Sequence, residues 1–337
     1  MGSVHHRRAR PTLRLLREDL ISGWDSPEPE RILAEGRLRQ LHPLSELPHP
    51  IIRKAAQSFG SDPSEDNFVG SISSSTSVPL LEIKQSQWRG GVWEEPGTGV
   101  CWLVVAGMAK GDHQDRDDFY QRVERENGLG DPTKWLPGPE DRRLLGQETA
   151  ARLRTEWELR SQESVFRALQ DVHQGGTRRI QIAHPVPDVG RFATVDLTVT
   201  AVREDGYDAD EILVEVIPEK QYAGTELFWQ LTVRVLISIE PPEQSWDRFG
   251  NTYTNIGEPG AWTARLTRLH SLVSVGELES SVPGSASHYA HRLHLAGKTI
   301  NGEAVRALCG VYFVPTQDHD ALPTCLVCEE RLAELPD

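Results

Sequence analysis

The sequence predicts an α+β protein of several domains, and three features of the chain lead to this class. Residues 88–120 contain the densest apolar and aromatic run, with the pattern of a buried hairpin. From residue 177 to about 240, β-branched residues dominate in segments that alternate apolar and polar. Three of the four cysteines lie near the C-terminus, downstream of several histidines. We therefore expect a helical lead-in with a flexible loop over 1–77, an α/β domain over 78–176, a β-rich domain over 177–284 and a metal-binding module over 285–337.

Length and composition set broad limits. A chain of 337 residues is long enough for two or three domains. With 38% hydrophobic and 26% charged residues, it should be soluble and globular. No apolar run approaches the length of a membrane span, and the basic N-terminus lacks the apolar core of a signal peptide. Because four cysteines are too few for a disulfide framework, we expect a reducing, cytoplasmic location and no membrane partner.

The net charge of −14 counts against general nucleic-acid binding, because phosphate contacts need Lys and Arg. A net negative charge is still compatible with a local basic groove. The simpler interpretation is that the acidity keeps the protein in solution.

The N-terminal residues predict short helices and loops. Residues 1–25 have the composition of a basic tail or a short helix. Pro27 and the acidic residues after it indicate a helix start, and the Leu-Pro-His-Pro run at 47–50 breaks that helix. Residues 51–59 predict a second short helix, and the Ser-rich residues 60–77 predict a flexible loop.

The next segment predicts a strand, a hairpin and two helices. We expect strands over 78–85, 88–93 and 100–107, with a Pro-Gly turn over 95–99. The strand VCWLVVAG is almost wholly apolar, as a central strand buried on both faces would be. Helices are expected over 117–126 and 140–173, and the second one should end at Gly175-Gly176.

The sequence WRGGVW, a short turn, VCWLVVAG and then K-G-D-H…DDFY resembles the β-core of RelE/HigB-type toxins, in the form found in phage-derived relatives. The resemblance covers residues 79–171. It implies a small antiparallel sheet with helices beside it and, in many relatives, mRNA cleavage without a metal. It also implies a toxin–antitoxin or phage-defence setting, with RNA or the ribosome and an antitoxin-like protein as partners.

Cleavage of RNA by its own 2′-hydroxyl needs a base, an acid and positive charge near the phosphate. The candidate catalytic residues of this endoribonuclease hypothesis are Lys84, Arg89, Lys110, His113 and Tyr120, with Arg116 nearby. Six carboxylates surround these residues in the sequence and oppose a phosphate. A solvated, charged loop is therefore the alternative interpretation.

The β-rich domain predicts strands over 178–184, 191–204, 211–219 and 226–240, arranged as a small sandwich or meander. A helix over 226–236 is the alternative for the last of them. Residues 261–272 have a weak helical pattern.

The C-terminal cysteines predict a zinc site. Zn²⁺ in structural sites takes four tetrahedral N or S ligands, and Cys325-x-x-Cys328 supplies one half of such a set. Cys309 stands before Gly310, which suits a turn that brings backbone amides near a thiolate. One upstream histidine would complete the site. The alternative is a buried trio of reduced cysteines without a metal. We interpret Cys101, in the apolar strand, as a small core residue.

The segment around these residues, with His-Tyr, then ALCG, then Pro-x-Cys-x-x-Cys, resembles a short, uncharacterised actinobacterial family. On that resemblance His288 is the fourth ligand, with His291 and His319 as alternatives. Four protein ligands leave no open position, so the predicted zinc is structural.

Two functions remain open at this point. The first is a toxin-like protein that cleaves RNA. The second is a non-catalytic, zinc-containing interaction or scaffold protein. The acidic charge favours the second and the hairpin motif favours the first, while the oligomeric state stays open.

Overall fold

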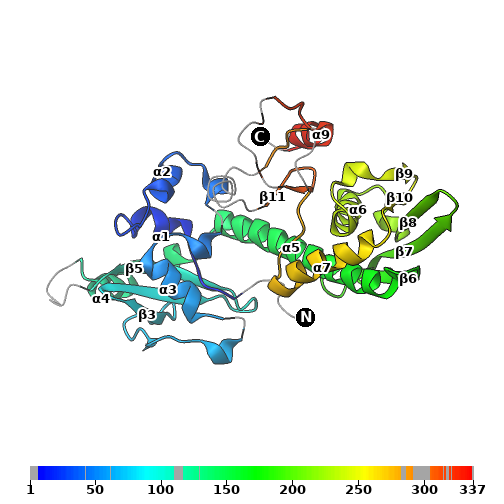
Figure 1. Cartoon of the computed structure of the whole chain (residues 1–337). Coiled ribbons are helices and arrows are strands. Elements are labelled where there is room, and N and C mark those ends of the chain that lie inside the picture. The colour runs from blue at the N-terminus through cyan, green and yellow to red at the C-terminus, as the bar shows by residue number, and fades with distance from the viewer. Residues whose placement is uncertain are drawn as a thin grey trace. The chain divides into compact units, whose positions relative to one another are not determined.

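The computed structural model describes residues 7–41, 43–60, 62–109, 117–128, 130–281, 286–290, 304–313, 315, 319 and 321–335. The chain divides into two compact units, Met1–Arg152 and Leu153–Asp337 (Figure 1). The boundary falls within helix α5 (Pro139–Val172). Helices and sheets occur together in both units, which confirms the predicted α+β class. The finer division into four segments stays a prediction.

The first unit contains a five-stranded sheet in the order β1-β5-β4-β3-β2. Its strands are β1 (Arg10–Pro11), β2 (Gly70–Ser71), β3 (Leu81–Gln85), β4 (Trp88–Glu94) and β5 (Cys101–Met108). Strand β1 runs parallel to β5, and the other pairs are antiparallel. The first six residues of β5 are all buried, because strands flank it and apolar side chains cover both faces. The predicted hairpin and its central strand are therefore confirmed.

Short helices surround this sheet. They are α1 (Leu13–Glu18), α2 (Glu28–Ala34), α3 (Pro50–Ser58) and α4 (Phe119–Gly128), with 3-10 turns η1 (Leu38–Gln40), η2 (Leu44–Glu46), η3 (Pro63–Glu65) and η4 (Pro132–Trp135). Helix α3 packs against β3, β4 and β5 through its buried face, Ile51, Ile52 and Ala55 (Figure 1).

Of the two interpretations of the N-terminal residues, the short helix is confirmed by α1, and the basic tail is wrong for the part that the structure describes. Leu13, Leu15 and Leu16 of α1 are buried, and the Thr12 hydroxyl accepts a hydrogen bond from the Leu15 amide at 3.3 Å. The basic residues contribute ion pairs rather than a solvated tail. For example, the Arg10 guanidinium lies 3.2 Å from the Glu148 carboxylate.

The second unit contains another five-stranded antiparallel sheet, in the order β6-β7-β8-β10-β9. Its elements are β6 (Gly176–Ala183), β7 (Arg191–Glu204), β8 (Tyr207–Pro218), η5 (Lys220–Tyr222), α6 (Glu226–Ile239), η6 (Glu243–Ser245), β9 (Asp247–Phe249), β10 (Thr252–Gly257) and α7 (Ala261–Val275). One face of the sheet and the helices α5, α6 and α7 form a single apolar core.

The strand predicted over 226–240 is helix α6, so the helical alternative was right. The Thr225 hydroxyl caps this helix by accepting from the Phe228 amide at 3.2 Å. Every residue from Gln230 to Ile239 is buried. A helix that is covered on nearly all sides has no polar stripe, and its apolar residues then look like those of a strand.

Among the described residues, none of the helices has the length and hydropathy of a membrane span.

Candidate metal centre

The C-terminal part of the second unit consists of a small hairpin and a helix. The hairpin pairs β11 (Val305–Arg306) with β12 (Tyr312–Phe313), and the helix is α9 (Leu326–Ala333). Cys309 lies in the turn of the hairpin. The amide of Ala307 donates to Val311 O at 2.7 Å, and that of Gly310 to Ala307 O at 3.0 Å. The turn needs a left-handed residue, and Gly310 supplies it with φ at +101°.

Cys325 and Cys328 lie at the start of α9. Cys325 is the N-cap residue, and the amide of Glu329 donates to its carbonyl at 3.1 Å. A spacing of three residues puts both thiols on one side of the first helical turn. The positive end of the helix dipole contributes in favour of a thiolate at both positions, although burial outweighs it at Cys325.

His288 comes from an extended segment that joins the other two elements. The Ser287 amide donates to Pro323 O and its carbonyl accepts from the Cys325 amide, both at 2.8 Å. On the other side, the Leu308 amide donates to Tyr289 O at 2.7 Å. His288 is therefore held between the hairpin turn and the helix start.

The four side chains converge on one point. One ligand atom each from His288, Cys309, Cys325 and Cys328 lies within 4.8 Å of the others. The His288 Nδ1 atom is 3.4 Å from Cys309 Sγ and 3.7 Å from Cys328 Sγ. In a tetrahedral zinc site with Zn–S bonds of about 2.3 Å and Zn–N bonds of about 2.0 Å, S and N ligands lie about 3.5 Å apart. The donor set and its spacing therefore fit such a metal.

The pKa values of the three thiols are shifted in different directions. A hydrogen bond from the Cys309 thiol lowers the pKa of Cys328, and His288 adds to this effect. The same hydrogen bond raises the pKa of Cys309, and burial raises that of Cys325. The surroundings thus stabilise the thiolate form of Cys328 and the protonated form of Cys309 and Cys325.

Of the two alternative histidines, only His319 lies in the part of the chain that the structure describes. His291 lies outside the described residues, and His319 is described but is not among the four converging side chains.

The candidate catalytic residues lie in the first unit. Lys84 and Arg89 are register partners on β3 and β4. The Lys84 ammonium is 3.4 Å from the Glu82 carboxylate, and the Tyr120 hydroxyl of α4 donates to the same carboxylate. Burial raises the pKa of Tyr120, and the bond to Glu82 raises it further. Three of the predicted residues therefore lie in one neighbourhood, centred on a carboxylate.

Arg89 also donates to its own turn, to Ser86 O at 2.8 Å and to Trp88 O at 2.9 Å. The predicted Lys110, His113 and Arg116 lie outside the described residues. Glu82 was missed by the sequence reasoning. Its position two residues before Lys84 on a strand, and hence on the same face, was the available signal.

Cys101 is fully buried in β5, and burial raises the pKa of its thiol to about 12. The interpretation of Cys101 as a core residue is therefore confirmed.

The comparisons with known proteins concern the C-terminal part alone. A family described as "Protein of unknown function (DUF3039)" matches residues 283–335, a range that contains all four converging side chains. No significant match was found among curated proteins or among solved structures. The resemblance to RelE/HigB-type toxins gains no support from these comparisons.

Proposed function

We propose that the four-residue cluster holds a structural Zn²⁺ and that the protein is a non-catalytic, zinc-containing scaffold or interaction protein. The observation that carries this proposal is the convergence of three thiols and one imidazole. Four protein ligands fill a tetrahedral shell and leave no position for a substrate or a reactive water.

The donor chemistry favours zinc over other abundant cations. Thiolates are soft ligands, whereas Mg²⁺ and Ca²⁺ require oxygen ligands. The neighbourhood also suits a structural metal, because Cys309 and Cys328 are buried in an apolar cluster with Ala307 and Val311. A segment this small buries little apolar surface, and a metal supplies the missing stability.

The test of this proposal is the metal content of the purified chain. We expect about one equivalent of zinc per chain by elemental analysis after dialysis, and loss of most of it in Cys325→Ser. Cys101→Ser is the matched control, because its thiol lies in the first unit and should leave the zinc content unchanged. A wild-type chain without zinc, or an equal zinc content in Cys325→Ser, contradicts the proposal.

Metal-independent RNA cleavage is the second candidate function. It is favoured by the contacts of Lys84 and Tyr120 with Glu82, and by Arg89, which is the register partner of Lys84 and lies beside Tyr120. Under this hypothesis the Glu82 carboxylate is the base for the 2′-hydroxyl, Tyr120 is the proton donor, and the two cations neutralise the phosphate.

Expression in a bacterium separates the two functions. If the chain is an RNA-cleaving toxin, the wild type arrests growth, and Arg89→Ala and Tyr120→Phe relieve the arrest. Arg178→Ala is the control, because it removes only an exposed ion pair with Asp171. Equal growth of the wild type and the variants rules out the toxin hypothesis and leaves the scaffold.

A further inference from the structure

Helix α6 has two apolar faces with different covers. One face packs into the core of the second unit through Leu231, Val235, Leu236 and Ile239. The other face carries Trp229, Val233 and Ile237, one turn apart, and packs against the metal-binding segment. The buried residues that cover this second face are Ala307, Cys309, Val311 and Cys328, and Cys325 packs against them as a partly buried side chain. Three of the four proposed ligands are thus part of the cover.

An ion pair between the partly buried Arg306 and the buried Glu158 fixes the first strand of the hairpin. The Arg306 Nη2 atom of β11 donates to Glu158 Oε1 of α5 at 2.8 Å and to Gln230 Oε1 of α6 at 2.9 Å. The Glu158 side chain is 2% exposed. Removing one partner of a pair this deep leaves an uncompensated charge, which is strongly unfavourable.

A buried arginine of α6 fixes the second strand. The Arg234 guanidinium is 4.8 Å from the centre of the Tyr312 ring of β12. The Arg234 Nη1 atom also donates to Glu279 O at 2.8 Å. Burial lowers the pKa of Arg234 and raises that of Tyr312 to about 12.

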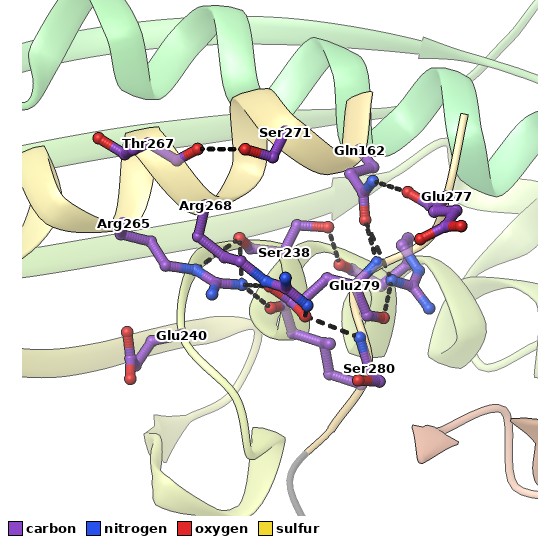
Figure 2. Close-up of polar contacts among 12 residues, drawn as sticks. Gln162, Ser238, Glu240, Arg265, Thr267, Arg268, Ser271, Glu277, Glu279 and Ser280 are labelled. Carbon is purple, nitrogen blue, oxygen red and sulfur yellow. Dashed lines mark hydrogen bonds and ion pairs between the residues drawn. The ribbon is translucent and has the colours of Figure 1, made fainter. Parts of the chain in front are cut away.

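The chain that leads into the metal-binding segment is fixed as well (Figure 2). The Gln162 side chain of α5 donates to Glu277 O at 2.8 Å and accepts from the Glu279 amide at 2.7 Å. The Glu279 carboxylate is buried and lies 2.6 Å from Arg265 and 3.4 Å from Arg268 of α7. The residues Glu277 and Glu279, which precede the hairpin in the chain, are therefore held in place by α5 and α7.

We propose that metal binding by the four-residue cluster is coupled to docking of the β11–β12 hairpin on α5 and α6, with Arg306 and Arg234 as positioning residues. This inference rests on the proposed zinc site. Cys309 stands three residues from each of Arg306 and Tyr312, so anchoring both strands fixes the ligand between them. Coupling of this kind is reciprocal: the metal strengthens docking, and docking strengthens metal binding to the same extent.

The first test measures zinc affinity in the full chain by competition with a chromophoric chelator. Arg306→Ala and Glu158→Gln should weaken zinc binding by about 10- to 100-fold, the range found when residues that support metal ligands are removed. Neither residue is a ligand. Arg179→Ala is the matched control, because Arg179 forms an exposed 2.6 Å ion pair with Asp196 on the sheet, and its zinc affinity should equal that of the wild type.

The second test follows the helix itself by hydrogen exchange. Chelation of the metal should increase exchange of the amides over 229–238 in the wild type, and Arg306→Ala should show the same increase with zinc still bound. If zinc binds the wild type and is lost from Cys325→Ser, but both positioning variants bind like the wild type, the coupling is wrong and the zinc site stands. If exchange of α6 is unchanged by chelation, the coupling is likewise wrong. If the wild type binds no zinc, both proposals fall.

Discussion

At the scale of single residues, His49 is a buried histidine whose surroundings favour the neutral ring. The ring lies edge-on to Trp24 and Trp88, with centroid distances of 5.1 and 4.6 Å. The Ile51 amide donates to Nδ1 at 3.3 Å, so Nε2 carries the proton and donates to Ser22 O at 3.0 Å. Burial lowers the pKa of His49, because a charged imidazolium would lose its hydration there.

The lowered pKa of His49 predicts an acid-dependent loss of stability. The unfolded chain binds a proton at this residue below about pH 6.5, while the folded chain resists it to a lower pH. The contribution is fully present above about pH 6.5 and is lost as the pH falls, by at most about 1.4 kcal/mol per pH unit. His49→Asn keeps a side-chain acceptor at the N-cap of α3 and removes the titration.

The measurement is denaturant unfolding at pH 7.5 and pH 5, followed by tryptophan fluorescence. The free energy of unfolding should fall less in His49→Asn than in the wild type over this range. An equal fall in the two proteins would mean that His49 is protonated alike in the folded and unfolded chains.

Single residues of the metal site were predictable to different degrees. Cys325 and Cys328 followed from their spacing, because thiol ligands in a Cys-x-x-Cys pair must lie on one helical turn or loop. Cys309 followed from its place before Gly310. His288 required a resemblance, since nothing in the spacing distinguishes it from His291. Glu82 was missed, because a carboxylate becomes a partner of Tyr120 only through packing of α4 beside β3.

At the scale of elements, Asp19 joins three parts of the first unit. Its carboxylate accepts from Arg14 of α1 at 2.9 Å and from Arg122 of α4 at 3.3 Å. It also accepts from the Ala106 amide of β5 at 3.0 Å. The Asp19 side chain is 2% exposed, so these donors replace the hydrogen bonds that water would otherwise make to its carboxylate.

Asp19→Asn should therefore lower the free energy of unfolding by about 3 kcal/mol, as expected when one partner of a buried ionic network is removed. Asp25→Asn is the matched control: Asp25 pairs with Arg53, but both side chains are about half exposed, and the expected loss is below about 1 kcal/mol. Chemical denaturation of both variants measures the difference. Similar losses in the two would show that Asp19 contributes no more than a surface pair.

Helices and strands were predicted correctly where the local sequence pattern matches the burial of the residues in the structure. Strands β4 and β5 followed from a Pro-Gly turn between two apolar runs, and α5 from a long mixed pattern closed by two glycines. Helix α6 was expected as a strand, because its second face is covered by residues more than 60 positions later in the chain. Contacts with such distant residues cannot be predicted from a local sequence pattern.

At the scale of the whole molecule, the predicted fold class was right because the pattern of apolar and polar residues along the chain indicates helices and strands. Alternating segments after residue 177 required a sheet with one buried face, and the second unit has that sheet. The order of the strands was not predictable, since it depends on contacts between distant segments. The parallel pairing of β1 with β5, for example, joins Arg10 to Trp102.

The double cover of α6 also bears on how the second unit is assembled during synthesis. The helix emerges well before the hairpin that packs against Val233 and Ile237. A nascent chain at that stage carries an incomplete fold with an unshielded apolar stripe, the kind of surface that chaperones bind. The packing of this helix is therefore completed only after the segment that carries Cys309 and Cys328 has been synthesised.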